Sequence, residues 1–403
     1  MISTPLTLSA ILIGVAAASA PEGAAVAVCA DGLDVREVVQ GNTAFAVDLY
    51  RRLGTEPGNL FVSPYSISLA LGMTYGGARG NTAVEMGQTM HFPARQEALH
   101  AALKRLTQRL ADTAGESGQK LNIANGLCVT GGELSPEYTE LLRSTYNAEL
   151  FDGGVDGINA WVHDKTEGKI EKILDDLSAN SVCVLLNAIY FKGLWDSQFE
   201  TSGTRDAPFT VAPDMHVTVP FMYQKCRFQV VRKEGFQAAS IPYQGKKMSM
   251  VILLPDDAAG LAALEKRVSA EHLVQWLAEL DAAPARELGL DLPKYKLETS
   301  YDLAGHLQGL GMTDAFDASG NADFTGMGWP KGDLWISQVK HKAFIEVNEE
   351  GTEAAAATAV EMVTKAAGPS PVFRADHPFL FLIRDNQTGA VLFMGRLVNP
   401  GAA

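Results

Sequence analysis

Residues 349–365 read EEGTEAAAATAVEMVTK, and this stretch decides how the rest of the chain is interpreted. Its run of alanines favours a helix, because alanine is the best helix former, and Glu361 stands four residues before Lys365, a stabilising spacing. The same stretch also suits a strand. At period two, every charge from Glu353 to Lys365 lies on one face, and the opposite face, from Thr352 to Thr364, carries none. A segment that can form either a helix or a strand indicates a switch between two conformations.

The start of this stretch suits insertion into a sheet. Small residues, Ala354 to Ala357 followed by Thr358, would pass between existing strands without clashes. Gly351 precedes them, and we expect it to give the backbone freedom at the point where the chain turns.

Periodicity predicts the elements around this stretch. Apolar spacing predicts helices over 35–53, 67–75 and 97–111, with Ser63 and Pro64 as helix-start residues and a capping-box pattern from Thr82 to Glu85. Runs of β-branched and aromatic residues predict strands over 182–191, 248–254, 340–347, 379–383 and 391–394. Helices dominate the first third and strands the remainder. This order predicts an α+β fold with mostly antiparallel sheets.

The composition excludes several classes of protein. The chain has 403 residues and a net charge of −14, which disfavours a nucleic-acid binder or a protein of anionic membranes. It lacks the H-E-x-x-H, G-x-S-x-G, Walker and G-x-G-x-x-G motifs, and its eight histidines show no metal-ligand spacing. The sequence therefore predicts no enzyme activity, no metal and no cofactor.

The N-terminus predicts export. Residues 6–18 are apolar but too short to span a membrane, and Ala18-Ser19-Ala20 has the form of a signal-peptidase site. No Lys or Arg precedes the apolar run, and Pro21 follows the expected cut. We predict a signal peptide and tail over residues 1–30, one domain over 35–400, and a secreted protein. Cys29, Cys128, Cys183 and Cys226 leave the disulfide state open.

From about Val35 to Pro400 the chain resembles inhibitory serpins. The matching stretches are, in order, Asn59–Ser66, Asn187–Trp195, Leu292–Lys294, Tyr301–Leu303, His341–Thr358, Phe373–Ile383 and Phe393–Pro400. The resemblance implies the serpin fold, in which helices pack around three mostly antiparallel sheets and a reactive-centre loop is exposed. It also implies suicide inhibition: a serine protease cleaves the loop, forms a covalent acyl complex, and is trapped when the loop inserts into the central sheet.

The resemblance assigns roles along the loop. The hinge comprises Glu349, Glu350, Gly351, Thr352, Glu353, Ala354, Ala355, Ala356, Ala357 and Thr358. Counting sixteen residues on from Glu349 reaches Lys365, so the reactive bond is expected between Lys365 and Ala366. A lysine at this position suits the acidic pocket of trypsin-like proteases. A shift of register to Ala366, Ala367 or Met362 would instead favour elastase-like or chymotrypsin-like proteases.

The resemblance also assigns two polar sites under and beside the sheet. Ser63, Ser66, Asn187 and His341 would form the shutter, a buried cluster beneath the central sheet. Trp195, Lys294 and Glu349 would form the breach, where the sheet opens, and Glu349 is expected to pair with Lys294.

Several alternatives stay open on the sequence alone. The chain can be a non-inhibitory serpin that acts as a carrier or chaperone, although small hinge residues fit the inhibitory pattern. It can also inhibit cysteine or subtilisin-like proteases through the same loop, or be a hydrolase. Lys104, Arg105 and Arg109 lie on a helix that some serpins use for heparin, but the net charge of −14 makes a glycosaminoglycan partner unexpected. A monomer is expected.

Overall fold

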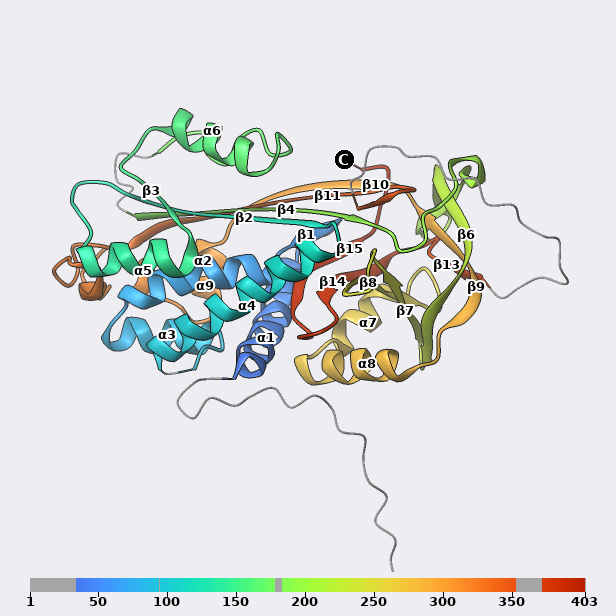
Figure 1. Ribbon diagram of the computed structural model, residues 1–403, viewed down its shortest axis with the longest axis horizontal. Helices are drawn as coiled ribbons and strands as arrows, with labels where there is room; N and C mark the ends of the chain where they lie inside the picture. Colours follow the sequence, from blue (N-terminus) through green and yellow to red (C-terminus); the bar gives the residue numbers. More distant parts are fainter. Residues whose placement is uncertain (1–33, 94, 178–182, 353–371, 403) are drawn as a thin grey trace, which may run out of the picture. The chain divides into compact units, whose positions relative to one another are not determined.

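A six-stranded sheet lies at the centre of the fold and contains Gly351 and Thr352, near the start of the stretch 349–365 (Figure 1). The computed structural model describes residues 34–402 apart from 94, 178–182 and 353–371. The strands run in the order β10 (Tyr295–Asp302), β11 (Ile336–Val347), β12 (Gly351–Thr352), β4 (Cys183–Leu194), β2 (Lys120–Val129) and β3 (Glu149–Phe151). β11 and β4 pair directly and in parallel, from Ile336↔Cys183 to Phe344↔Tyr190. Beyond that pairing the short β12 lies between them, antiparallel to both.

The second sheet has nine strands. Its order is β1 (Leu60–Val62), β15 (Val391–Leu397), β14 (Phe379–Asp385), β8 (Met248–Pro255), β7 (Phe236–Pro242), β6 (Met215–Lys233), β9 (Arg286–Pro293) and β13 (Val372–Arg374), with β5 (Arg205–Ala212) also on β6. The long β6 pairs with β5 and β9 through its first part and with β7 through its last part. The three sheets expected from the resemblance are therefore the central sheet and the two parts that β6 joins.

Helices cover both faces of the central sheet (Figure 1). The described helices are α1 (Val35–Leu53), α2 (Pro64–Gly77), α3 (Gly80–Thr89), α4 (Gln96–Glu116), α5 (Pro136–Tyr146), α6 (Val155–Lys165), α7 (Leu261–Arg267), α8 (Ala270–Ala282) and α9 (Ala304–Gly309). Three short 3₁₀ turns, η1 (Thr201–Gly203), η2 (Asp314–Phe316) and η3 (Thr325–Met327), complete the elements. On one face α6 packs on β2 and β4 through Ile158 and Val162. On the other face α2 is buried along its length and carries Ser66, one of the two serines assigned to the shutter.

Several predicted elements are confirmed. The first helix spans Val35–Leu53, and Ser63 caps α2 by accepting the Ser66 N–H, with Pro64 in the first turn. The capping box at Thr82 is wrong. α3 begins at Gly80, and the Glu85 carboxylate instead accepts the backbone N–H groups of Thr313 and Asp314. Glu85 therefore binds backbone groups that are distant in the sequence instead of the local backbone at Thr82.

Leu33–Ala403 forms one compact unit, which contains the predicted domain over 35–400. Cys128, Cys183 and Cys226 are free thiols, and Cys29 lies outside the described residues. Across the described part of the chain, no helix combines the length and apolar character needed to cross a membrane.

Candidate functional site

The four residues assigned to the shutter lie together beneath the central sheet. The Ser63 backbone N–H donates to Nε2 of His341 (3.2 Å), and Nδ1 of His341 lies 2.6 Å from Oδ1 of Asn187. The Asn187 amide donates to Oγ of Ser66 (2.6 Å), and the Ser66 N–H donates to Oγ of Ser63 (3.2 Å). The four residues thus close a ring of hydrogen bonds between α2 and the two central strands β4 and β11.

This ring fixes the protonation of His341. A backbone N–H can only donate, so Nε2 of His341 must be the unprotonated acceptor, and Nδ1 carries the proton that Asn187 accepts. His341 is 1% exposed. Burial disfavours the charged imidazolium and lowers the pKa of His341 to about 3, so the ring is neutral at physiological pH.

Asn125 is a further member of this cluster that the sequence did not indicate. It lies opposite Asn187 in the register of β2 and β4, and its Oδ1 accepts a hydrogen bond from the Asn187 amide (2.9 Å). His341 lies opposite Asn187 on the other side. The polar groups therefore form a row across β2, β4 and β11.

Residues 348–352, which we call the proximal foot, lie at the central sheet and lead into the loop that follows Thr352. The Glu349 carboxylate pairs with Nζ of Lys294 (2.8 Å) and accepts from the Thr204 hydroxyl (2.7 Å). Burial acts to raise the pKa of Glu349, but these two hydrogen bonds outweigh it, so the pKa is lowered and the carboxylate stays charged. The structure thus brings Lys294 and Glu349 together, and Thr204 is a partner that sequence reasoning missed.

Trp195 holds the backbone of the proximal foot. Its N–H donates to the Glu350 carbonyl (2.9 Å), and its indole Nε1–H donates to the Asn348 carbonyl (3.0 Å). The indole stacks on Tyr243 (4.8 Å between ring centroids), whose hydroxyl lies 2.6 Å from Oγ1 of Thr352. Tyr243 is a second partner without a sequence signal, since it lies on the turn between β7 and β8.

Gly351 is required for a reason other than the one predicted. Its φ lies outside the left-handed region, so the turn does not demand glycine. A Cβ at this position would lie 2.0 Å from the Gly193 carbonyl oxygen and 2.8 Å from Cα of Leu194. Close approach of two strands, rather than backbone freedom, therefore excludes any side chain here.

Residues 372–377, which we call the distal foot, begin where the chain is described again. β13 pairs in parallel with β9 over Val372–Arg374 only. Nε of Arg374 donates to the Asp291 carboxylate (2.9 Å), and Arg205 donates to both oxygens of that carboxylate (2.8 and 3.1 Å). The Asp291 side chain is 2% exposed, so one buried carboxylate joins β5, β9 and β13.

Glu353, Ala354–Ala357 and Thr358 of the hinge and the reactive pair Lys365 and Ala366 lie outside the described residues. The described chain leaves the central sheet at Thr352 and joins the second sheet at Val372.

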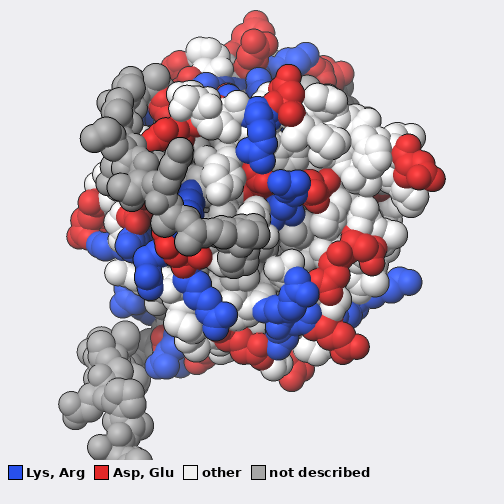
Figure 2. Space-filling model, turned by 90° about the vertical axis from the view of Figure 1, so that its right-hand side faces the viewer, with Lys and Arg blue, Asp and Glu red and all other residues white. Residues whose placement is uncertain are grey.

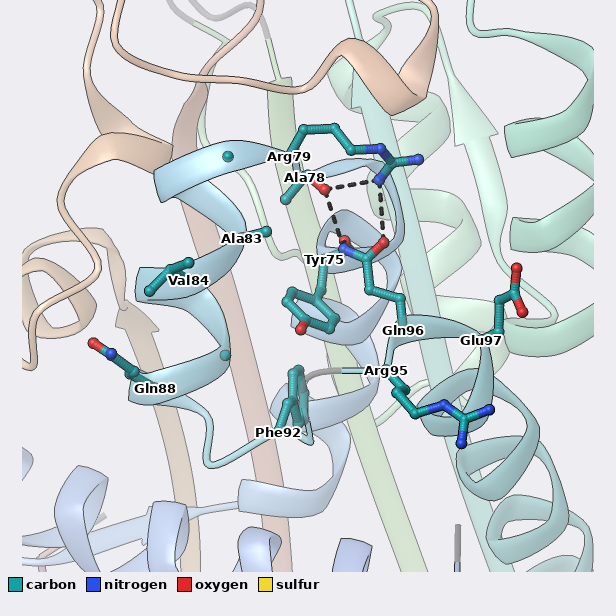
Figure 3. A pocket seen from close by; sticks show the side chains of 12 residues that line it. Tyr75, Ala78, Arg79, Ala83, Val84, Gln88, Phe92, Arg95, Gln96 and Glu97 are labelled. Carbon is teal, nitrogen blue, oxygen red and sulfur yellow. Dashed lines mark hydrogen bonds between the residues drawn. The ribbon is translucent and has the colours of Figure 1, made fainter. Parts of the chain in front are cut away.

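A cavity of about 670 Å³ lies elsewhere, between α3 and the start of α4 (Figure 3). Tyr75 and Phe92 form its aromatic floor, and the Arg79 guanidinium donates to the Gln96 amide oxygen at its rim. Among the described residues that line it there is no serine, cysteine or histidine to act as nucleophile or base. The described chain also holds no group of three or more His, Cys, Asp or Glu placed to bind a metal.

Positive and negative side chains are interspersed on the face that carries β6, β9 and β13 (Figure 2). Lys104, Arg105 and Arg109, the residues considered for heparin, are exposed on α4.

Comparison with known proteins gives a consistent result. Residues 40–400 match the family model described as Serpin (serine protease inhibitor). The leukocyte elastase inhibitor of Sus scrofa is 41% identical over 390 residues, with 91% of this chain and all of the relative covered. Serpin B6 of Pongo abelii is 39% identical, covering 90% of this chain and 99% of the relative. Among solved structures, human thyroxine-binding globulin (28% identity, TM-score 0.82) covers 91% and 99%, and uncleaved ovalbumin (30%, TM-score 0.80) covers 90% and 100%.

These comparisons correct the predicted export. Leukocyte elastase inhibitor and serpin B6 are matched over 99–100% of their own length by about nine-tenths of this chain. They therefore contain no counterpart of the apolar N-terminal stretch on which the prediction rested, and that stretch lacks the basic residues that open a signal peptide. The prediction of a secreted protein is wrong.

Proposed function

The chain belongs to the serpin family, a family of protease inhibitors rather than enzymes, and on this premise we propose that it is a suicide-substrate inhibitor of a trypsin-like serine protease. One observation carries the proposal: Gly351 and Thr352 already pair as a strand between β11 and β4. A chain that continues from Thr352 in the same direction enters the seam between these two strands.

The strand arrangement makes insertion favourable. Where β12 ends, β4 and β11 pair directly with each other. They form a single parallel ladder from Phe344↔Tyr190 to Ile336↔Cys183. An inserted strand antiparallel to both would replace this ladder by two antiparallel ladders, and antiparallel pairing is slightly more stable per residue. The uncharged period-two face beginning at Thr352 would lie against the core, and Thr352 itself is fully buried.

The covalent step uses the chemistry of the target protease. Its serine Oγ attacks the carbonyl carbon of Lys365, the Lys365–Ala366 amide bond breaks, and Ala366 leaves as a free amine with a proton from the protease histidine. Lys365 is then bound to the protease as an ester. Insertion of residues 353–365 carries the ester and the protease away before water completes the hydrolysis.

The shutter ring has a defined role in these steps of inhibition. His341 on β11 and Asn187 on β4 are adjacent across the seam, and their hydrogen bond of 2.6 Å joins the two strands. A strand that enters the seam must separate them. We propose that the ring holds the sheet closed until cleavage frees the loop.

Lys365 and the relatives point to different targets. A lysine favours trypsin-like proteases. The relatives from Sus scrofa and Homo sapiens are named leukocyte elastase inhibitors, and a shift of register to Ala366 would suit an elastase. We assign the target class to trypsin because the counted position carries a charge that an elastase pocket does not bind.

The test is to incubate the purified protein with trypsin and, in parallel, with elastase, chymotrypsin, subtilisin and papain. We expect a trypsin complex that survives boiling in detergent, and a released peptide that begins at Ala366 by mass spectrometry. Lys365→Ala is expected to shift complex formation from trypsin to elastase. A complex with elastase alone in the unmodified protein would overturn the trypsin assignment and keep the inhibitor assignment.

Cleavage of the loop by every protease without a stable complex would overturn the inhibitor assignment. The chain would then belong with the non-inhibitory members. Human thyroxine-binding globulin, solved with thyroxine bound, shares the fold at a TM-score of 0.82, so the fold alone does not decide between inhibitor and carrier.

A further inference from the structure

We propose that the cavity between α3 and the start of α4 binds a small aromatic carboxylate that carries a second hydrogen-bond acceptor. The proposal goes beyond the proposed function, because the lining residues, from Tyr75 to Glu97, lie outside the loop and both feet. The volume of about 670 Å³ is typical of sites that hold small organic ligands. Four features of the walls select this class of ligand: an open helix face, an aromatic floor, a poorly bonded hydroxyl and an excess positive charge.

The face of α3 that lines the cavity is kept open by small residues. Four of the lining residues share the i, i+3, i+4, i+7 spacing of one helix face: Gly80, Ala83, Val84 and Gly87. A face of this kind normally packs against the core, but Val84 is 52% exposed. The cavity wall therefore offers apolar surface to solvent, and a ligand that covers this surface gains binding free energy.

The aromatic floor contains a buried hydroxyl with a poor hydrogen bond. The Tyr75 and Phe92 rings lie 5.4 Å apart at 51°, and aromatic rings prefer tilted or offset neighbours at such distances, so this floor favours a ligand with a ring. Tyr75 is 3% exposed, yet the acceptor for its hydroxyl among the described residues is the Pro93 carbonyl at 3.5 Å, against the usual distance of about 2.7–2.8 Å. A Cβ added to Gly87 would lie 3.4 Å from this hydroxyl, which therefore faces the open wall of α3. A ligand oxygen in the cavity would supply the acceptor that the hydroxyl lacks.

The rim of the cavity carries one positive charge in excess. Its charged residues are Arg79, Arg95 and Glu97, and none of them forms an ion pair within the part of the chain that the structure describes. Nη1 of Arg79 donates to two backbone carbonyls at the end of α2 and to the Gln96 amide oxygen, so the guanidinium is held in place over Gln96 (Figure 3). Its Nε and Nη2 groups have no acceptor among the described residues. An arginine fixed in this way suits a carboxylate, which accepts two parallel hydrogen bonds.

The test is a calorimetric titration of the full chain with 6-hydroxy-2-naphthoate, a flat aromatic carboxylate with a hydroxyl group. We expect saturable binding at one site per chain with a Kd on the order of 0.1 mM. The melting temperature should rise with the concentration of this probe, because it binds the folded chain. 2-Naphthoate, which lacks the oxygen for Tyr75, should bind about threefold more weakly, and the uncharged 6-hydroxy-2-naphthamide about tenfold more weakly.

Three variants separate the features of the cavity. Gly87→Leu places a side chain in the space in front of Tyr75 and replaces a glycine inside a helix, so binding should be lost while the free protein melts at the same temperature or higher. Tyr75→Phe should remove the preference for 6-hydroxy-2-naphthoate over 2-naphthoate. Arg79→Gln should weaken 6-hydroxy-2-naphthoate about tenfold and leave the affinity for the uncharged naphthamide unchanged.

Arg109→Gln is the matched control. Arg109 is also an exposed arginine and lies on α4, but it does not line the cavity, so this variant should keep the full affinity. Equal weakening in Arg79→Gln and Arg109→Gln would show attraction to net charge alone and overturn the proposal. The proposal would also be overturned if the unmodified chain showed no saturable binding, if Gly87→Leu bound as well as the unmodified chain, or if octanoate bound as tightly as 6-hydroxy-2-naphthoate. If Arg79→Gln did not fold, Gly87→Leu and Tyr75→Phe would decide the outcome.

Discussion

Gly351 shows at the scale of one residue how tightly the proximal foot is seated. The Gly193 carbonyl oxygen would lie 2.0 Å from an added Cβ, and this oxygen is part of the β4 backbone and cannot move aside. We expect Gly351→Ala to force the foot out of the seam, with a loss of about 1–3 kcal/mol in the free energy of unfolding. Denaturant melting measures this loss.

Gly115→Ala is the control for that substitution. Gly115 lies in α4 with nothing within 4 Å of an added Cβ, so alanine should leave the stability unchanged or raise it by up to about 1 kcal/mol. If the two variants melted alike, the close approach at Gly351 would not contribute to stability.

Two buried histidines predict how stability depends on pH. Burial lowers the pKa of His341 to about 3, and burial with the nearby charge of Arg79 lowers that of His100 to about 4, from the ordinary value of 6.5. As the pH falls below about 6.5, both histidines therefore become protonated in the unfolded chain but stay neutral in the folded chain. The stability from these groups is fully present above pH 6.5 and falls as the pH drops toward 4, by about 1.4 kcal/mol per pH unit for each histidine.

His341→Gln tests the larger of these two effects. Urea midpoints between pH 7.5 and 4.5 should fall less steeply in this variant than in the unmodified protein, although its stability at pH 7.5 is lower. His163→Gln, at a side chain that is 54% exposed, should keep the original slope. A slope unchanged in His341→Gln would contradict a neutral buried imidazole at this position.

The sequence identified the centre of the site better than its surroundings. Ser63, Ser66, Asn187 and His341 were assigned through the resemblance, and the structure brings all four into one ring. Asn125, Thr204, Tyr243 and Asp291 were missed because their partners are far away in the sequence. A polar residue that acts through such a partner leaves no local pattern of spacing or propensity.

At the scale of elements, the ion pair between Lys294 and Glu349 couples the end of β9 to the proximal foot. Lys294 follows Pro293, the last residue of β9, and its backbone N–H donates to Pro220 on β6, so the ammonium group is held in place. Lys294→Glu would set two carboxylates against each other at the entrance of the seam. We expect the foot to separate from β4, with polymers or a spontaneously inserted monomer on native gels.

Lys233→Glu controls for charge reversal as such. Lys233 pairs with Glu279 at a comparable side-chain exposure of 25%, against 36% for Lys294, but joins β6 to α8 away from the loop. An unchanged monomer in Lys294→Glu, or the same polymers in both variants, would count against a role for the breach pair.

Element prediction succeeded for strands with continuous apolar runs and missed several other elements. The run predicted over 182–191 corresponds to β4, and the run over 391–394 to β15, because fully buried strands are continuous in their apolar residues. β6 was not predicted, since its 19 residues alternate between exposed and buried and include Pro220. α7 and α8 were also missed, and they interrupt the strands of the second half.

At the scale of the whole molecule, the loop joins two sheets that cannot both hold it once it inserts. The proximal foot belongs to the central sheet through β12, and the distal foot belongs to the second sheet through β13. The shutter ring joins α2 to β4 and β11 in the central sheet, and the buried Asp291 carboxylate joins β5, β9 and β13 in the second sheet. Two polar groups in different layers therefore lie near the two ends of the loop, each built from residues distant in sequence.

This arrangement predicts that the seam accepts a separate strand. A synthetic peptide with the sequence of residues 352–365 should add between β4 and β11 and replace their parallel ladder, without cleavage of the chain. We expect the complex to melt at a higher temperature than the free protein and to lose inhibition, because the seam is filled and the chain's own loop cannot enter. A peptide of scrambled order is the control, since it keeps the composition but disrupts the uncharged period-two face. A rise in melting temperature with both peptides would indicate nonspecific binding. No rise with either would mean that the seam between β4 and β11 does not open while the loop is intact.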